Sequence, residues 1–125
     1  MYFRAAFLKC ACEKRRKESN MDELLEVKGN ILIIYVPEEL DHHCAEKIRI
    51  ESDRILTKQN IRQIVFDFRR TVFMDSSGIG VIMGRYRNIN LLGGRVKAIH
   101  VGEQVEKILR ISGIYKVIAI ETEHK

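Results

Sequence analysis

The sequence predicts an α/β domain in which a mixed, mostly parallel β-sheet packs against helices, in the order β-β-α-β-α-β-α-β. Two observations predict this class. A pair of β-rich runs opens the patterned part of the chain and is split by the turn signal Gly29-Asn30. Beyond it, apolar β-branched runs alternate with stretches whose apolar residues recur every three or four positions. Such alternation is typical of parallel strands joined by helical crossovers.

Composition and charge narrow the classes of function. A chain of 125 residues suits one domain with a small core, and 46% hydrophobic and 31% charged residues are ordinary for a soluble globular protein. Residues 1–20 hold six bases and two acids, whereas the other 105 hold 16 bases and 15 acids. The body therefore lacks the sustained basic face of a nucleic-acid-binding protein. No apolar run approaches the roughly 18 residues of a membrane span, so we expect neither nucleic acid nor membrane as a partner.

Residues 1–20 are predicted to be a basic leader that is disordered or precedes the true start, and the domain is predicted to span residues 21–125. Residues 17–18 can be encoded as AAG-GAG, a bacterial ribosome-binding sequence, and two codons separate them from Met21. We therefore weigh Met21 against Met1 as the native start. Two of the three cysteines lie in this leader, and the odd count predicts reduced thiols rather than a disulfide framework.

The first elements are a β-hairpin and a long helix. The β-rich runs of residues 24–36 are joined at the glycine turn, and Pro37 ends the second run because proline cannot donate to a β-ladder. Asp41 is a natural N-cap for the helical pattern that follows it. The residues expected on the buried stripe of this helix are Cys44, Ile48, Ser52, Ile55 and Leu56.

A strand and a second helix come next. The strand is expected over residues 61–68, and its continuous apolar centre, residues 64–66, predicts cover on both faces. The helical pattern is expected over residues 78–92, GIGVIMGRYRNINLL, and stops at Gly93-Gly94. Its apolar stripe, flanked by Arg85 and Arg87, is expected to consist of Ile79, Ile82, Met83, Tyr86 and Ile89.

The last three elements are a strand, a short helix and a strand. The strand is expected over Arg95–Val101, and the helix over Glu103–Ser112, where Gly113 ends it. The final strand is expected over residues 116–120.

The stretch FMDSSGIG, residues 73–80, is the candidate functional motif. Phe73 and Met74 are expected to finish a buried strand and Asp75 to cap the next helix, which leaves Ser76 exposed in the first helical turn. Ligand and regulatory sites concentrate at this kind of junction in α/β sheets. Capping explains one polar residue well, but it explains three consecutive polar residues less well. The stretch matches neither the Gly-x-Ser-x-Gly elbow of a hydrolase nor a phosphate-binding loop.

Three glycines follow the serines. Gly78 and Gly80 are expected to keep the surface low around Ser76. Gly80 and Gly84 lie four residues apart on one helix face, and the favoured explanation is close packing on the sheet, because a glycine within a helix costs ~1 kcal/mol. The alternative is a shallow surface that a partner contacts.

Adjacent histidines, His42 and His43, open the first helix. Neighbouring side chains on a helix point in different directions, and metal-binding pairs are usually four residues apart. We therefore expect no metal here, and an exposed helix start that serves as interaction surface.

Five segments together resemble the STAS-domain anti-sigma factor antagonists of the sporulation type. They read E-L-D-H-H-x-A, I-R-x-I-V, F-M-D-S-S-G-x-G-V-I-x-G-R-Y, G-G and S-G-x-x-K-V-I, and the resemblance covers residues 21 to about 121. It implies the STAS fold, no catalytic activity, no cofactor and a cytoplasmic location. It also implies a partner that is both an anti-sigma factor and a serine kinase, bound to ATP or ADP. Pro37-Glu38 departs from the family, which often has glycine before E-L-D.

The resemblance implies a phosphorylation switch at Ser76, the first serine after the aspartate. The unphosphorylated protein would bind the anti-sigma factor and release the sigma factor, which promotes sporulation transcription. Phosphorylation by that kinase would reverse binding, and a serine phosphatase of the PP2C type would restore it. Contacts with the partner are expected at Asp41, His42, Asp75, Ser77, Gly78 and Ile79, with capping as the equally weighted role of Asp41. The alternatives are a STAS module of a general stress sigma pathway and, less favoured, a small serine hydrolase.

Overall fold

The computed structural model describes residues 24–122, so the predicted leader and the choice between Met1 and Met21 lie outside the described residues. The strands of its main sheet are β1 (Leu25–Lys28), β2 (Ile31–Tyr35), β4 (Gln63–Asp67), β6 (Arg95–Val101) and β7 (Ala119–Thr122). They lie in the order β1-β2-β4-β6-β7. β1 is antiparallel to β2 and the other neighbours are parallel, which confirms the predicted mixed, mostly parallel sheet.

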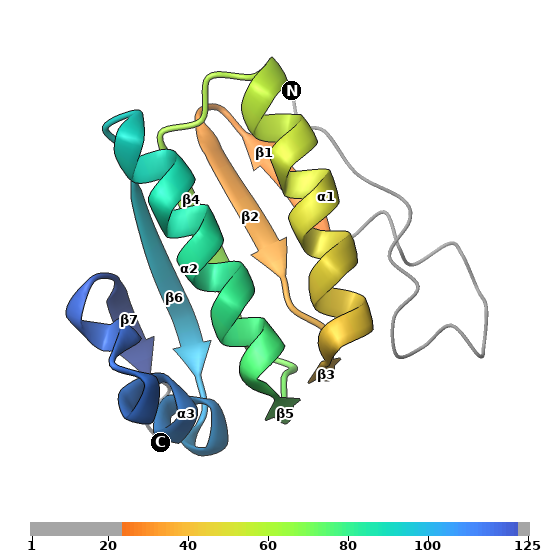
Figure 1. The fold of residues 1–125 in the computed structure, drawn as a ribbon, viewed down its shortest axis with the longest axis vertical. Helices are drawn as coiled ribbons and strands as arrows, with labels where there is room; N and C mark the ends of the chain where they lie inside the picture. Colours follow the sequence, from red (N-terminus) through yellow and green to blue (C-terminus); the bar gives the residue numbers. More distant parts are fainter. Residues whose placement is uncertain (1–23, 123–125) are drawn as a thin grey trace.

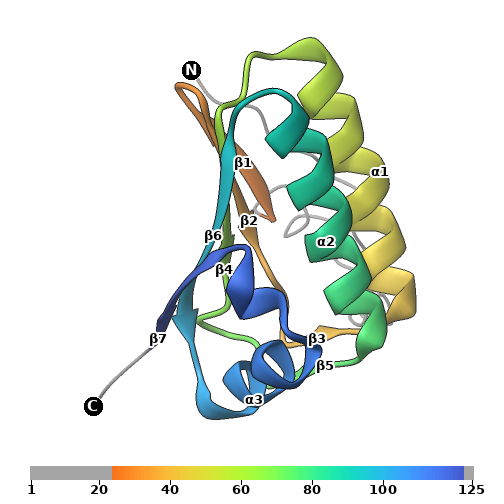
Figure 2. The same ribbon diagram turned by 60° about the vertical axis from the view of Figure 1, so that its left-hand side comes forward.

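Helices lie on one face and at one end of this sheet. They are α1 (His42–Lys58), α2 (Ser76–Leu91) and α3 (Glu103–Ser112). α1 and α2 run side by side across the face, and α3 lies past the carboxyl end of β6 (Figures 1 and 2). No helix within the described range is long and apolar enough to cross a membrane.

The helical cover of the main sheet is one-sided within residues 24–122. Ile64 and Phe66 of β4 are wholly buried, whereas Val65, which points to the opposite face, is half-buried. The prediction that this strand is covered on both faces is therefore wrong. The strand order explains why: β2, β4 and β6 follow one another in a single direction, so right-handed crossovers place α1 and α2 on the same face.

Two short strands, β3 (Glu39–Leu40) and β5 (Phe73–Met74), form a ribbon that was not expected, although Phe73 and Met74 were expected to end a strand. They pair in parallel as a separate ribbon, with Leu40 opposite Met74. Figure 1 shows this ribbon at the end of the molecule where α1 and α2 begin. Strands of two residues carry no measurable periodicity, and for that reason the sequence pattern does not reveal them.

The hairpin turn and the predicted end of α3 are confirmed. Gly29 has φ +63 between the antiparallel strands β1 and β2, and Gly113 ends α3 in the left-handed region at φ +83. The final strand begins later than the predicted residue 116. The short 3-10 helix η3 (Ile114–Lys116) follows α3, and β7 begins at Ala119. The amide of Ile118 donates to the carbonyl of Ile114 at 3.2 Å, so this stretch forms turns rather than ladder bonds.

The buried stripe of α1 is confirmed. Cys44, Ile48, Ser52 and Ile55 are buried, and Leu56 packs partly buried against the core. Cys44 is disulfide-bonded, so the expectation of reduced thiols is wrong for this residue. The chain's other cysteines lie outside the described residues, and cysteine count and spacing do not show which thiols a fold brings together.

Arg85 departs furthest from the predicted helix faces, because it is buried rather than flanking the apolar stripe. Its side chain is 3% exposed, and its Nη2 lies 2.8 Å from Asp53 Oδ1 of α1. Its Nη1 donates to the backbone oxygen of Arg49 at 2.9 Å and to the Ser52 hydroxyl. The Nε atom has no hydrogen-bond partner among residues 24–122, and burial lowers the pKa of the guanidinium. This set of contacts, the Arg85 clasp, ties the middle of α2 to the middle of α1.

Candidate functional site at the start of two helices

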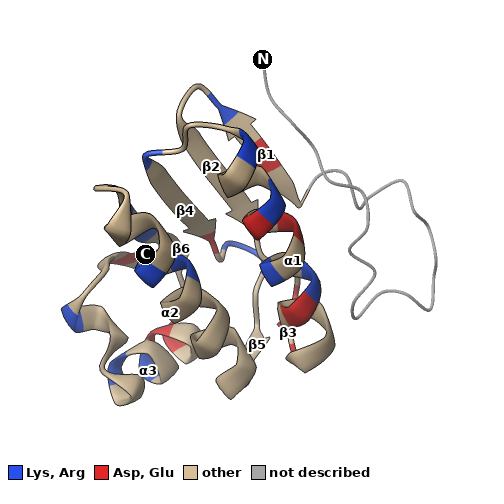
Figure 3. Cartoon of the chain, turned by 45° about the horizontal axis from the view of Figure 1, so that its top comes forward, with Lys and Arg blue, Asp and Glu red and all other residues tan. Residues whose placement is uncertain are grey.

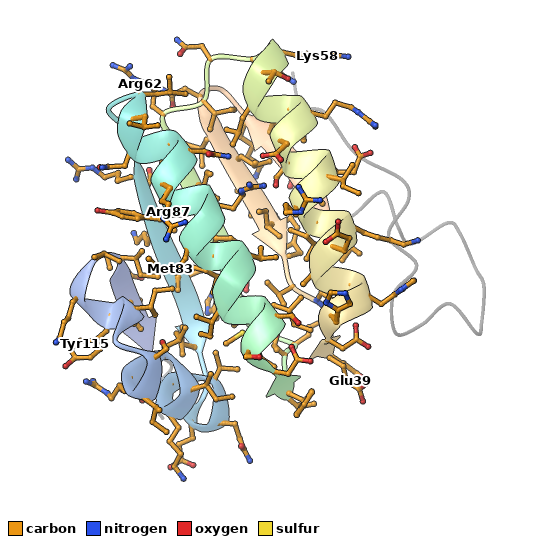
Figure 4. The ribbon with its side chains drawn as sticks, in the orientation of Figure 1. Glu39, Lys58, Arg62, Met83, Arg87 and Tyr115 are labelled. Atoms are coloured by element: carbon orange, nitrogen blue, oxygen red, sulfur yellow. The ribbon has the colours of Figure 1, made fainter. Side chains whose placement is uncertain are left out.

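The pairing of β3 with β5 places the starts of α1 and α2 side by side. Leu40 and Met74 are register partners, and the amide of Asp75 donates to the carbonyl of Leu40 at 3.3 Å. The next residue in each segment, Asp41 and Asp75, is the N-cap of a helix. Figure 4 shows Glu39 at this end of the helices, whereas Lys58 and Arg62 lie at the opposite end.

Both aspartates are caps, as the sequence predicts. Asp41 Oδ1 accepts from the amide of Cys44 at 2.9 Å, and Asp75 Oδ1 accepts from the amide of Ser77 at 2.8 Å. Each carboxylate is half-buried and satisfies one of the free N–H groups of its helix. The capping role of Asp41 is thus confirmed, and its contact with a partner stays a prediction.

The two serines of the motif have different surroundings. Ser76 is the first residue of α2 and is exposed, as predicted, and its hydroxyl has no hydrogen bond to any described residue. Ser77 is half-buried, and its Oγ lies 3.4 Å from Nδ1 of His42 at the start of α1. One hydroxyl is therefore open to solvent, whereas the other is engaged across the two helices.

Gly78 is buried beneath the helix start. An added Cβ would lie 2.4 Å from Met74 Cγ and 2.9 Å from Leu40 Cδ2, so a side chain does not fit between α2 and the β3–β5 ribbon. The expectation that Gly78 lowers the outer surface around Ser76 is therefore wrong, because the glycine makes room inward. Its predicted contact with a partner is untested.

Gly80 and Gly84 have the opposite environment. An added Cβ at either position would meet no atom within 4 Å. Close helix–sheet packing, the favoured explanation from the sequence, is therefore wrong for both. The alternative, an open surface near Ser76, agrees with this geometry. Ile79, the remaining expected contact, is partly buried against the core.

Charge is distributed unevenly over the two helices. Figure 3 shows both signs along α1, where a hydrogen bond from Arg49 lowers the pKa of Glu46. Between Ser76 and Gly84, α2 has no charged residue. A charge added at Ser76 would therefore lie beside Asp75 and next to an uncharged stretch of α2. Within residues 24–122, no group of three or more His, Cys, Asp or Glu side chains is placed to hold a metal ion.

An exposed apolar pair next to the motif was missed by sequence reasoning. Phe73 is 49% and Val72 62% exposed, whereas Met74 is 1% exposed. The expectation that Phe73 and Met74 both finish a buried strand is thus wrong for Phe73. Neighbouring side chains of a strand point to opposite faces, but a strand of two residues is too short for the sequence to show which of them faces outward.

This chain is similar in sequence and in structure to STAS-domain proteins and to anti-sigma factor antagonists. A model of the STAS domain matches residues 24–125. The anti-sigma F factor antagonist of Paenibacillus polymyxa is 36% identical over 101 residues, which are 81% of this chain and 86% of that protein. The unphosphorylated anti-sigma factor antagonist SpoIIAA superposes with a TM-score of 0.66 at 27% identity, covering 81% of this chain and 87% of that one. The phosphorylated form of the Bacillus cell fate determinant SpoIIAA gives a TM-score of 0.65 at 32% identity, with coverage of 79% and 90%.

Proposed function

Because the chain belongs to the STAS domain family, we propose that it is an anti-sigma factor antagonist controlled by phosphorylation of Ser76. In this proposal the unphosphorylated protein binds an anti-sigma factor in the cytoplasm and frees a sigma factor. The anti-sigma factor is also an ATP-dependent serine kinase, and phosphate on Ser76 ends the complex. A serine phosphatase of the PP2C type restores binding. The observation that carries the proposal is the exposed hydroxyl of Ser76, which no described residue hydrogen-bonds, beside a second helix start.

The helix start explains how the fold tolerates a phosphate there. Ser76 follows the N-cap Asp75, so a phosphate on it lies at the positive end of α2. A negative charge at that position stabilises a helix by about 0.3–1 kcal/mol. The existence of SpoIIAA in unphosphorylated and phosphorylated forms supports a fold that persists in both states. Phosphorylation would therefore act on binding rather than on folding.

The same charge opposes an interface built on this surface. Phosphoserine adds about −1.5 to −2 charges, and taking an ion out of water without a partner costs several kcal/mol. Asp41 and Asp75 lie at the same end of the helices, and their repulsion of the phosphate grows when a partner excludes water from this surface. The interface penalty thus exceeds the capping gain, and the sign of the switch follows: phosphorylated protein is released.

The partner surface is proposed to comprise the residues around Ser76 on the two helix starts. Asp41, His42, Asp75 and Ser77 lie there. The relative in Paenibacillus polymyxa is named for an anti-sigma F factor, and this supports the same class of partner and a role in sporulation. A serine hydrolase is not favoured, because no described histidine hydrogen-bonds to Ser76.

Incubation with the anti-sigma F factor of Paenibacillus polymyxa tests the proposal. Wild-type protein is expected to bind that factor with ADP, and to acquire one phosphate, mapped to Ser76, with ATP. Ser76→Ala is expected to bind and to stay unphosphorylated, because its hydroxyl is gone. Ser77→Ala is the matched control and keeps phosphorylation at Ser76. Absence of a complex in wild type, or phosphate on another residue, contradicts the proposal.

Substitution of the two surface glycines is expected to raise stability and to lower partner affinity. Gly80→Ala and Gly84→Ala remove helix-interior glycines from sites with free space, so each stabilises the fold by about 0.5–1 kcal/mol. If the partner lies over α2 near Ser76, an added methyl group meets it and reduces affinity by about tenfold or less. Urea unfolding and titration calorimetry measure the two effects.

Asn90→Ala is the matched control for the glycine variants. Asn90 is exposed at the far end of α2, and alanine raises helix propensity there too. This variant is expected to gain stability with no change in affinity. Glycine variants that bind as tightly as wild type would place the partner elsewhere.

A further inference from the structure

Two adjacent serines, Ser76 and Ser77, lie at the start of α2, and a kinase could in principle phosphorylate either of them. Ser76 and Ser77 carry the same hydroxyl and lie in the same turn, so their chemistry alone does not distinguish them as phosphate acceptors. Their surroundings do, because Ser76 is exposed and unbonded whereas Ser77 is half-buried and engaged by His42. The contact comes from another helix, 35 positions away in the sequence.

His42 is held in place by the elements that build the site. It is the first residue of α1 and directly follows Asp41, whose carboxylate is fixed on the amide of Cys44. The β3–β5 ribbon fixes the start of α1 against the start of α2. The first turns of the two helices are thus held side by side, and in this arrangement Ser77 Oγ lies 3.4 Å from His42 Nδ1.

We propose that His42 is a positioning residue that makes Ser76 rather than Ser77 the phosphate acceptor, by engaging the Ser77 hydroxyl across the two helix starts. The proposal rests on the proposed function, because it concerns the selectivity of that phosphorylation. With the ring proton on Nε2, Nδ1 accepts from the Ser77 hydroxyl. With the proton on Nδ1, that N–H donates to Ser77 Oγ. Either bond holds the Ser77 side chain in the rotamer that faces α1, so the hydroxyl has to rotate away from His42 before it can meet a phosphoryl donor at the exposed start of α2.

The steps of phosphoryl transfer show why the contact with His42 disfavours Ser77 as the acceptor. The acceptor Oγ forms a bond to the γ-phosphorus of ATP, the bond from that phosphorus to the β–γ bridging oxygen breaks, ADP leaves and the hydroxyl proton passes to a base of the kinase or to water. Ser76 does this without losing a hydrogen bond. Ser77 has first to leave His42 and its half-buried position. Loss of one side-chain hydrogen bond corresponds to about a three- to tenfold disadvantage.

The experiment measures the ratio of phosphate on Ser77 to phosphate on Ser76 by fragment mass spectrometry. The kinase is the anti-sigma F factor of Paenibacillus polymyxa with ATP. Because both serines are on one chain, the ratio does not depend on how tightly the kinase binds. His42→Ala is expected to raise the ratio about three- to tenfold. His43→Ala is the matched control, an exposed histidine one position further, and leaves the ratio unchanged.

A conservative variant separates this role from a general loss of structure. The amide of asparagine reaches the position of Nδ1, so His42→Asn is expected to keep the wild-type ratio with the same melting temperature. In a Ser76→Ala background, Ser77 is expected to be phosphorylated about three- to tenfold faster in His42→Ala than in His42→Asn. A ratio unchanged in His42→Ala overturns this inference alone. Wild-type protein with no phosphate on Ser76 overturns the proposed function and this inference together.

Discussion

Ser76→Asp is expected to lower affinity for the anti-sigma factor by about 100- to 1,000-fold, which corresponds to about 2.8–4.2 kcal/mol. The carboxylate introduces a charge on a part of α2 that has none, and binding removes water from it. At the helix start the same charge is favourable by at most about 1 kcal/mol, so the melting temperature is expected to stay within about 8 °C of wild type.

Ser76→Asn is the matched control for charge. It has nearly the same size as the aspartate variant and no charge, so it is expected to lose far less affinity. Titration calorimetry gives the affinities, and thermal unfolding followed by circular dichroism gives the stabilities. An aspartate variant that binds like wild type, or one that binds weakly because it is unfolded, would contradict a switch that acts at the interface.

Asp53→Ala is expected to destabilise the fold by about 2–3 kcal/mol, the largest effect on stability that we predict. It leaves the Arg85 guanidinium, 3% exposed, without its counter-ion and close to the like charge of Arg49. Asp53 is 40% exposed, and water entering at its position keeps the loss below that of a wholly buried pair. The hydrogen bond that Asn88 donates to Asp53 is lost as well.

Arg85→Met is expected to cost less than Asp53→Ala, although it removes the centre of the clasp. A methionine of similar length fills the space and removes both the buried charge and the unpartnered Nε. Urea unfolding of both variants measures which of them loses more free energy of unfolding. Glu46→Ala, which breaks an exposed ion pair with Arg49, is the control and is expected to change stability far less than Asp53→Ala. A larger loss in Arg85→Met than in Asp53→Ala contradicts our account of the clasp.

Features that depend on neighbouring residues were predictable from the sequence. The Gly29-Asn30 turn, the cap at Asp41 and the end of α3 at Gly113 each follow from local backbone and hydrogen-bond requirements. The exposed position of Ser76 follows in the same way, because Asp75 starts the helix and the next side chain points outward.

Features that depend on contacts between distant segments were not predictable from one sequence. Arginine usually lies on the surface, so the sequence gives no reason to expect Arg85 to be buried. Its hydrogen-bond partner Ser52 is 33 positions away in the sequence. Gly78 and Gly80 look alike in the sequence, yet an added Cβ would meet Met74 at the first and open space at the second. The periodicity that reveals helices says nothing about which atoms another element brings near.

The sequence by itself therefore determined the order of elements, the helix caps, the exposed position of Ser76 and the family resemblance. Each of these depends on residues that are close together along the chain. Only the tertiary structure decided that two helices start side by side, that His42 meets Ser77 rather than Ser76, and that Gly80 and Gly84 face open space. The reason is geometric: a pairing of two-residue strands, Leu40 with Met74, joins segments with no periodic signal, and the site exists only after they meet.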